Sequence, residues 1–254
     1  MIDNPYASPD VLSHTPEPQK RRRFSFLKLF TVIGIIAVLV AFLLPATRRG
    51  RPAANRTQCK NNLKQIALAL HNYFDSYEAL PPAYTVDANG KPLHSWRTLI
   101  LPYLEQQELY KRIDLSKPWN DPANTKAFET ELDIFRCPSA VMPPNQTTYM
   151  AIVSPNGCFR PGESTRFSDI TDGTSNTLMV IEVAPEHAVP WMAPQDADEQ
   201  LVLSFGPDSK LAHTGGTQAA LVDGSVRFLS DNIPTEVRRA LISIAGDDND
   251  GLDF

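Results

Sequence analysis

The sequence predicts an α+β fold in which helices come first and a mainly antiparallel sheet follows. An apolar segment and an amphipathic helical pattern fill the first third of the 254 residues, and short β-like runs separated by turn signals fill the second half. Apolar residues make up 42% of the chain, as in a globular protein with a core. Helices that precede the strands, rather than alternating with them, favour α+β over α/β.

Charge is distributed unevenly along the chain. Residues 1–64 carry 11 basic and 3 acidic side chains, whereas residues 65–254 carry 13 basic and 26 acidic ones. The chain is therefore a short basic end joined to a long acidic body, with a net charge of −5. This balance excludes a generally basic nucleic-acid-binding protein, and no nucleic-acid partner is expected.

The basic end predicts a tail and a membrane span. Residues 1–23 are polar and proline-rich and finish on a run of four basic residues, so we expect a disordered, basic, cytoplasmic tail. Residues 24–44 (FSFLKLFTVIGIIAVLVAFLL) would extend about 31 Å as a helix, close to the ~30 Å hydrocarbon core of a bilayer. We expect a transmembrane helix there, with the lipid bilayer as its partner.

A signal peptide, an export signal and a buried core helix each fit the apolar segment less well. A cleaved signal peptide needs a shorter apolar region and an A-x-A-like site, which Leu44-Pro45-Ala46 does not provide. A twin-arginine export signal would match Arg21–Phe24 but not the residues that follow. A buried core helix would not have basic clusters at both ends.

The orientation of the span does not follow from its flanking charges, because basic residues are about equally frequent on both sides. A short tail and a long acidic body favour a body outside the cytoplasm. We therefore expect a single-pass protein of the inner (cytoplasmic) membrane, with residues 45–254 extracytoplasmic.

An amphipathic helix is predicted over Thr57–Leu80. Its apolar stripe follows an i, i+3, i+4, i+7 spacing and should pack on the sheet; it comprises Leu63, Ile66, Ala67, Leu70, Phe74 and Tyr77. Pro45, Gly50 and Pro52 are expected to kink or interrupt the path between the span and this stripe.

The remaining elements are predicted in chain order. An extended stretch over 83–93 precedes a helix capped by Ser95 that runs over 96–113 with a bend near Pro102, then a loop over 114–125 and a helical turn over 126–132. Strands are expected over 147–153, 177–184, 200–205, 217–222 and 225–229, with a closing helix over 234–245. The last two strands form a hairpin around Asp223-Gly224.

Three cysteines leave the disulfide state open. In an oxidising compartment Cys137 and Cys158 could close a loop, with a stabilisation of roughly 3 kcal/mol. All three, including Cys59, could equally be small buried apolar residues.

No local motif for chemistry is present. The chain has no C-x-x-C, H-E-x-x-H, G-x-S-x-G or P-loop, so no metal site, cofactor or catalytic residue is expected. The run DDNDGLD (247–253) resembles part of a calcium loop but lacks its first acidic residue and the glutamate at its twelfth position, so it is expected to be a solvated end.

One pair of positions stands out near the C-terminus. Nine residues separate His213 from Asp223-Gly224. On an extended strand, at about 3.3 Å per residue, His213 and Asp223 would lie some 30 Å apart and could not share a proton. Asp223 is expected to set the hairpin turn and Gly224 to supply a positive φ, so a structural role is favoured for the motif.

These pieces together resemble a large bacterial family that carries the prepilin-type processing-associated H-x9-DG domain (domain of unknown function 1559). The resemblance covers about Phe30 to Gly246 and rests on the order of RTQCKNNLKQIALALHNY, SWRTLILPYLEQQELY, FRCPS, FSDITDGTSNTLMVIEV, VPW and the His213, Asp223, Gly224 motif. It implies a pilin-like N-terminal helix, an anchored body outside the cytoplasm and no established activity. Other pilin-like or secretion-system subunits are the protein partners that it implies.

The chain departs from the prepilin pattern at two positions. Pilin-like precursors are cleaved between Gly and Phe and carry Glu at the fifth mature position, whereas this chain has Leu29 before Phe30 and Gly34 in place of the Glu. A permanently anchored relative is therefore expected rather than a filament subunit.

Three functional hypotheses follow. The first is a non-enzymatic, membrane-anchored, pilin- or pseudopilin-like envelope protein with a structural or assembly role. The alternative is a membrane-anchored extracellular solute- or glycan-binding module, whose cleft would use Trp96, Trp119 or Trp191. The third is a hydrolase with a polar site around His94, His187 or His213.

Overall fold

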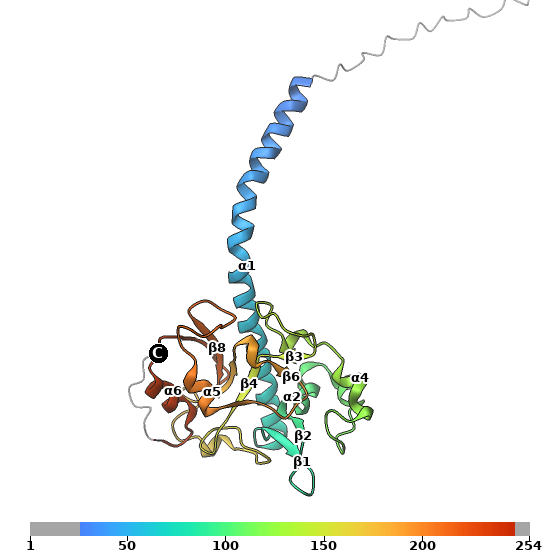
Figure 1. Ribbon diagram of the computed structural model, residues 1–254, viewed down its shortest axis with the longest axis vertical. Helices are drawn as coiled ribbons and strands as arrows, with labels where there is room; N and C mark the ends of the chain where they lie inside the picture. Colours follow the sequence, from blue (N-terminus) through green and yellow to red (C-terminus); the bar gives the residue numbers. More distant parts are fainter. Residues whose placement is uncertain (1–25, 247–254) are drawn as a thin grey trace, which may run out of the picture. The chain divides into compact units, whose positions relative to one another are not determined.

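The computed structural model describes residues 26–246, except for the side chains of Leu27 and of residues 41–50. Two compact units divide the chain, residues 1–48 and residues 49–254. The elements are labelled in Figure 1. The expected tail over 1–23 and the acidic run over 247–253 lie outside the described residues.

The first unit contains the beginning of the long helix α1 (Phe26–Tyr77). All described side chains from Lys28 to Val40 are exposed, including those of Phe30 and Ile35. Among the residues with described positions, no helix is both long and apolar enough to cross a membrane. Residues 24–25 and the side chains of 41–44 lie outside the described residues, so the transmembrane helix stays a prediction.

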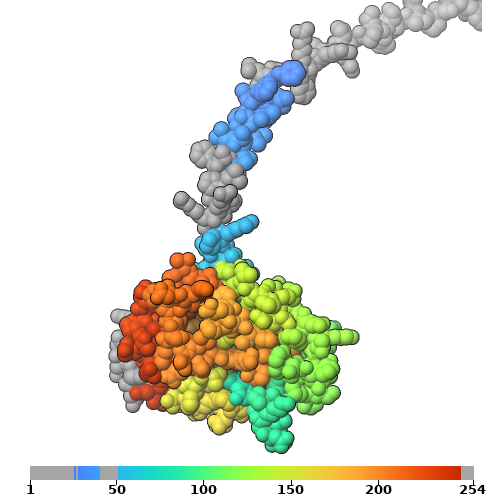
Figure 2. All heavy atoms as spheres, viewed as in Figure 1, coloured from blue at the N-terminus to red at the C-terminus, as the bar shows by residue number. Residues whose placement is uncertain are grey.

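The second unit is built around the remainder of α1, from residue 49 onward. Four positions of the predicted stripe, Leu63, Ile66, Ala67 and Leu70, are completely buried. On the face of the body drawn in Figure 2, later segments of the chain cover most of this part of α1. The predicted interruption near Pro45, Gly50 and Pro52 is wrong, because the helix continues through all three. A proline inside a helix removes one N–H donor and crowds the carbonyl oxygen four residues earlier, which usually kinks or breaks a helix. The helix α1 nevertheless continues on both sides of each proline.

A five-stranded sheet lies against α1, and its strand order is β7-β4-β5-β8-β9. The strands are β4 (Tyr149–Val153), β5 (Leu178–Glu182), β7 (Ala197–Asp198), β8 (Gly216–Leu221) and β9 (Val226–Ser230). Neighbours are antiparallel except for β4 and β7, which are parallel. The α+β class and the mainly antiparallel sheet are confirmed.

Alternation along the strands gives the sheet two buried faces. In β4, Tyr149 and Ala151 join the apolar cluster that contains the α1 stripe. Met150 and Ile152 join a second cluster with α5 (Glu199–Ser204) and α6 (Thr235–Ile242). The sheet is therefore a middle layer, with α1 on one face and two short helices on the other.

The other elements are short. Two small antiparallel ladders join β1 (Tyr84–Val86) to β2 (Pro92–Ser95) and β3 (Gln146–Thr147) to β6 (Val189–Pro190). The short helices are α2 (Trp96–Leu99), α3 (Gln107–Tyr110) and α4 (Thr125–Phe128). The 3₁₀ turns are η1 (Leu101–Leu104), η2 (Pro122–Asn124), η3 (Asp133–Phe135), η4 (Phe167–Asp169) and η5 (Pro185–His187).

Two predicted elements differ from the structure. The helix expected over 96–113 is three separate turns, and the left-handed φ of +59° at Glu105 ends the second of them, η1. The strand expected over 200–205 is the helix α5. Asp198 caps it by accepting a hydrogen bond from the Leu201 N–H at 2.7 Å, and this cap outweighs the β-like composition.

Candidate functional site

The His-x9-Asp-Gly motif lies on the β8–β9 hairpin, with its residues at opposite ends of β8. Asp223 accepts a hydrogen bond from the Ser225 N–H at 2.8 Å in the turn, and Gly224 has a φ of +81°. His71 of α1 contacts the same turn through Nε2, 2.8 Å from the Val222 carbonyl oxygen. This end of the motif therefore joins the hairpin turn to the long helix.

The other end of the motif places His213 inside the body. His213 lies just before β8 in the chain. Gly215 and Gly216, which have φ values of +84° and +154°, lead from it into the strand. Its Nε2 lies 3.2 Å from Oε2 of Glu182, the last residue of β5. The two side chains are only 4% and 1% exposed. The motif histidine thus faces a buried carboxylate on the neighbouring strand, and Asp223 is not its partner.

A disulfide adjoins this pair. Cys59 of α1 is bonded to Cys137, which follows η3, and their Cα atoms are 5.3 Å apart. Cys137 Sγ lies 3.7 Å from His213 Nε2. Asn62, one turn after Cys59, donates hydrogen bonds to the Asp133 and Arg136 carbonyls. The segment that carries Cys137 is therefore attached to α1 both by the disulfide and by these hydrogen bonds.

The predicted pairing of Cys137 with Cys158 is wrong. Cys158 is a free, buried thiol whose Sγ lies 3.3 Å from the Leu178 carbonyl oxygen. The fold packs Cys137 onto the long helix, where Cys59 is its partner. The observed bond joins positions 78 residues apart. In the chain-entropy model such a cross-link lowers the entropy of the unfolded chain and thereby stabilises the folded state by roughly 4 kcal/mol.

The electrostatic surroundings of Glu182 are unusual for a carboxylate. Oε1 has no hydrogen-bond partner among the described residues. Burial raises the pKa of Glu182, and the neighbouring His213 opposes this rise. Tyr149 pairs with Glu182 across β4 and β5, and the pKa of its hydroxyl is raised by burial and by that carboxylate. The site is therefore shielded from solvent, and its buried polar and charged groups depend on partners within the protein.

Four potential metal ligands meet at this point. One ligand atom from each of Cys59, Cys137, Glu182 and His213 lies within 4.8 Å of the others, and all four residues are buried. No metal site was expected from the sequence, because the four residues come from four separate segments and form no short motif. The only signal in the sequence was that each belongs to a different segment of the family pattern.

A second buried polar centre fixes the segments around the sheet. Arg97 is fully buried and lies 2.6 Å from Asp196. Its guanidinium also donates hydrogen bonds to the Trp191, Tyr149, Ala193 and Gln195 carbonyls. Trp96 and Trp191 are likewise buried and are therefore not available to line an exposed glycan cleft.

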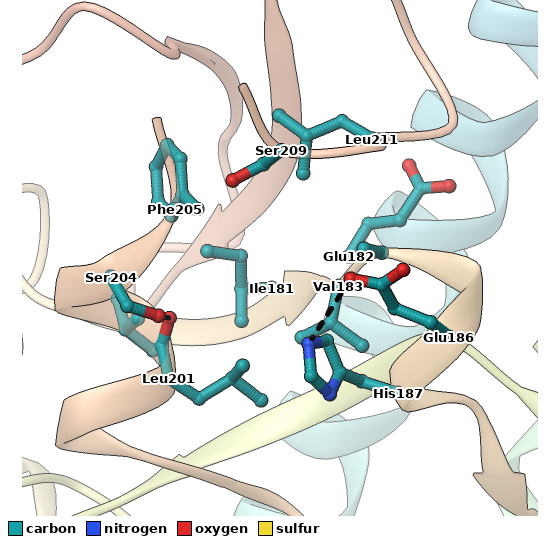
Figure 3. A pocket seen from close by; sticks show the side chains of 12 residues that line it. Ile181, Glu182, Val183, Glu186, His187, Leu201, Ser204, Phe205, Ser209 and Leu211 are labelled. Carbon is teal, nitrogen blue, oxygen red and sulfur yellow. Dashed lines mark hydrogen bonds and ion pairs between the residues drawn. The ribbon is translucent and has the colours of Figure 1, made fainter. Parts of the chain in front are cut away.

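A small pocket lies on the other side of β5 and holds about 50 Å³ (Figure 3). Ile181, Leu201 and Phe205 form its apolar part, and Glu182 directs its carboxylate away from the Leu201 and Phe205 side chains. His187 Nε2 and Glu186 Oε1 are 3.8 Å apart at its rim, on half-exposed side chains. The third histidine named for a hydrolase site, His94, is buried against the Lys117 carbonyl, so the three do not converge.

Comparison with known proteins gives one family. A family model described as a protein of unknown function (DUF1559) matches residues 48–208, more than half of the chain. The matched range contains Cys59, Cys137 and Glu182 and ends before His213. No curated protein and no solved structure matches the chain.

Proposed function

This chain belongs to the DUF1559 family, and we propose that it is a non-enzymatic envelope protein, held in the inner membrane by residues 24–44, whose acidic body outside the cytoplasm has a structural or assembly role. The bilayer is its proposed partner on the N-terminal side. Other pilin-like or secretion-system subunits are its proposed protein partners.

The character of α1 carries this proposal. The helix begins with a stretch in which every described side chain from residue 28 to residue 40 is exposed, most of them apolar. Farther along the same helix, four positions of the predicted stripe are completely buried in the body, although Tyr77 at its end is exposed. Exposed apolar residues on every side of a helix are unfavourable in water and suit a lipid environment. One helix that is suited to lipid at its beginning and to the protein interior farther along is the arrangement expected of a membrane anchor.

The interior of the body supports a structural role rather than catalysis. Its polar centres, around Arg97 and around His213, are closed from solvent and hold segments together. The disulfide is of the kind that persists in oxidising compartments outside the cytoplasm. Leu29 and Gly34 replace the residues that prepilin processing and filament packing would use, so the proposed anchor is permanent.

Membrane anchoring is tested with charged substitutions in α1. The full chain should stay in the membrane pellet after alkaline carbonate washing and be released by detergent. Arginine at both Ile35 and Val38 should make the chain extractable, because each charge at the centre of a span is unfavourable by about 2.5–3.5 kcal/mol.

The matched control carries arginine at Leu68 and Tyr77, which are exposed on the body part of the same helix; Leu68 and Ile35 are 62% and 61% exposed. This control should remain in the pellet. Carbonate extraction of the unchanged chain, or equal behaviour of the two double variants, would refute the proposed anchor.

A further inference from the structure

The His213 cluster has the dimensions of a metal site. In a tetrahedral zinc site, bonds of ~2.0–2.3 Å give distances of roughly 3.3–3.8 Å between ligand atoms. The His213 Nε2 to Glu182 Oε2 distance is 3.2 Å, and the Cys137 Sγ to His213 Nε2 distance is 3.7 Å. Cys59 Sγ completes a group whose members all lie within 4.8 Å of one another.

The charges of the cluster also favour a cation. Glu182 is 99% buried, yet its Oε1 has no hydrogen-bond partner among the described residues. A buried carboxylate is unfavourable unless a positive charge lies close to it, and the neighbouring charge partner in this structure is the His213 imidazole. Two thiolates and one carboxylate together carry three negative charges, which a divalent cation would reduce to one.

We propose that reduction of the Cys59–Cys137 disulfide opens a buried site in which both thiolates, His213 Nε2 and the Glu182 carboxylate bind one Zn²⁺ ion. Two sulfur ligands with one imidazole and one carboxylate suit zinc and disfavour magnesium and calcium, which take oxygen ligands. Four protein ligands make the site closed and structural. The inference does not depend on the proposed anchoring.

The disulfide and the metal exclude each other chemically. A dithiol reductant transfers two electrons and two protons to the Cys59–Cys137 bond, which becomes two thiols, while the reductant closes to its own disulfide. Zn²⁺ then displaces the two thiol protons into the buffer and forms two Zn–S bonds. The oxidised chain has no thiolate at these positions and should not bind the ion.

The experiment uses the full chain in detergent, reduced with a dithiol that is then removed under anaerobic conditions. Titration with Co²⁺, followed by visible and near-ultraviolet absorption, should give thiolate-to-cobalt charge transfer that saturates at one equivalent. Zn²⁺ should displace the cobalt, and the untreated oxidised chain should give no signal.

Variants assign the ligands. Cys137→Ser removes one of the two sulfur ligands, so it should lower the charge transfer per bound cobalt ion. Cys137→Ser, Glu182→Gln and His213→Gln should each weaken Zn²⁺ binding at least about tenfold. Cys158→Ala removes a buried thiol that lies outside the cluster, and its binding should match that of the unchanged chain. Far-ultraviolet circular dichroism establishes that each variant is folded.

Alkylation of the unchanged chain gives an assignment that needs no variant. Zn²⁺ should protect Cys59 and Cys137 from an alkylating reagent, and a chelator should restore their reactivity, as mapped by mass spectrometry. The proposal is overturned if the reduced chain binds no ion, if Cys137→Ser binds as tightly as the unchanged chain, or if the oxidised chain binds equally. Loss of fold on reduction that Zn²⁺ does not reverse would overturn it as well.

Discussion

At the scale of single residues, the body depends on a few buried polar side chains whose partners the sequence could not identify. Arg97 and His213 were visible in the sequence as members of motifs, but their contacts come from distant segments. Glu182 lies within an apolar run (LMVIEV), and no role was assigned to it from the sequence. Only the pairing of β5 with β8 and the packing of α1 bring it to His213 and the disulfide. Burial of this kind follows from tertiary structure and leaves no local pattern.

His94 makes the stability of the body depend on pH. Its Nε2 donates to the Lys117 carbonyl at 2.7 Å, and its buried Nδ1 has no hydrogen-bond partner among the residues that the structure describes. Burial lowers the pKa of His94, although the Lys117 carbonyl and Asp114 oppose this effect. Because the unfolded chain binds the proton more readily, the free energy of unfolding should fall as the pH drops below about 6.5 and stop falling below the folded pKa.

Urea unfolding of the full chain in detergent, repeated between pH 8 and pH 5, measures this dependence. His94→Gln keeps a donor near Lys117 and cannot titrate, so its loss of stability below about pH 6.5 should be smaller. A profile parallel to that of the unchanged chain would show that His94 does not cause the effect.

At the scale of elements, the sequence predicted those whose signals are local. The Asp223-Gly224 turn gave the hairpin of β8 and β9, and the 3.6-residue stripe gave the body part of α1. The segment QLVLSF was assigned to a strand as a short, largely apolar run, whereas the structure has the helix α5 there, capped by Asp198. The sheet order and the parallel β7 depend on long connections and were not predictable.

Gly216 is the glycine on which the hairpin depends most. Its φ of +154° and its pairing with Ser230 place the backbone against β9, so an added Cβ would overlap the Leu229 carbonyl oxygen. Gly216→Ala should lower the free energy of unfolding by about 2–4 kcal/mol, because the backbone cannot shift without opening the ladder. Gly206→Ala, where nothing lies within 4 Å, should change it by less than about 0.5 kcal/mol.

Urea unfolding followed by tryptophan fluorescence compares the two alanine variants directly. Equal stabilities for Gly216→Ala and Gly206→Ala would mean that the hairpin relaxes around the new methyl group. The predicted dependence of the β8–β9 hairpin on Gly216 would then be wrong.

At the scale of the whole molecule, the protein is an acidic α+β body joined through one helix to an apolar segment. The class of fold could be predicted from the sequence, whereas the disulfide partner and the His213 cluster required the structure. The proposed membrane attachment and location rest on the apolar segment, its basic flanks and the exposed side chains of α1. The proposal therefore predicts both the N-terminus of the protein in cells and the oxidation state of its cysteines.

Intact mass measurement of the chain from purified membranes, after alkylation without prior reduction, tests the proposed anchor most directly. We expect an uncut chain that begins at Met1 or Ile2, with Cys59 and Cys137 unmodified and alkylation confined to Cys158 once the protein is denatured. A chain found in the soluble fraction without residues 24–44, or one that begins at Phe30, would contradict the permanent anchor. Alkylation of all three cysteines would contradict a body located outside the cytoplasm.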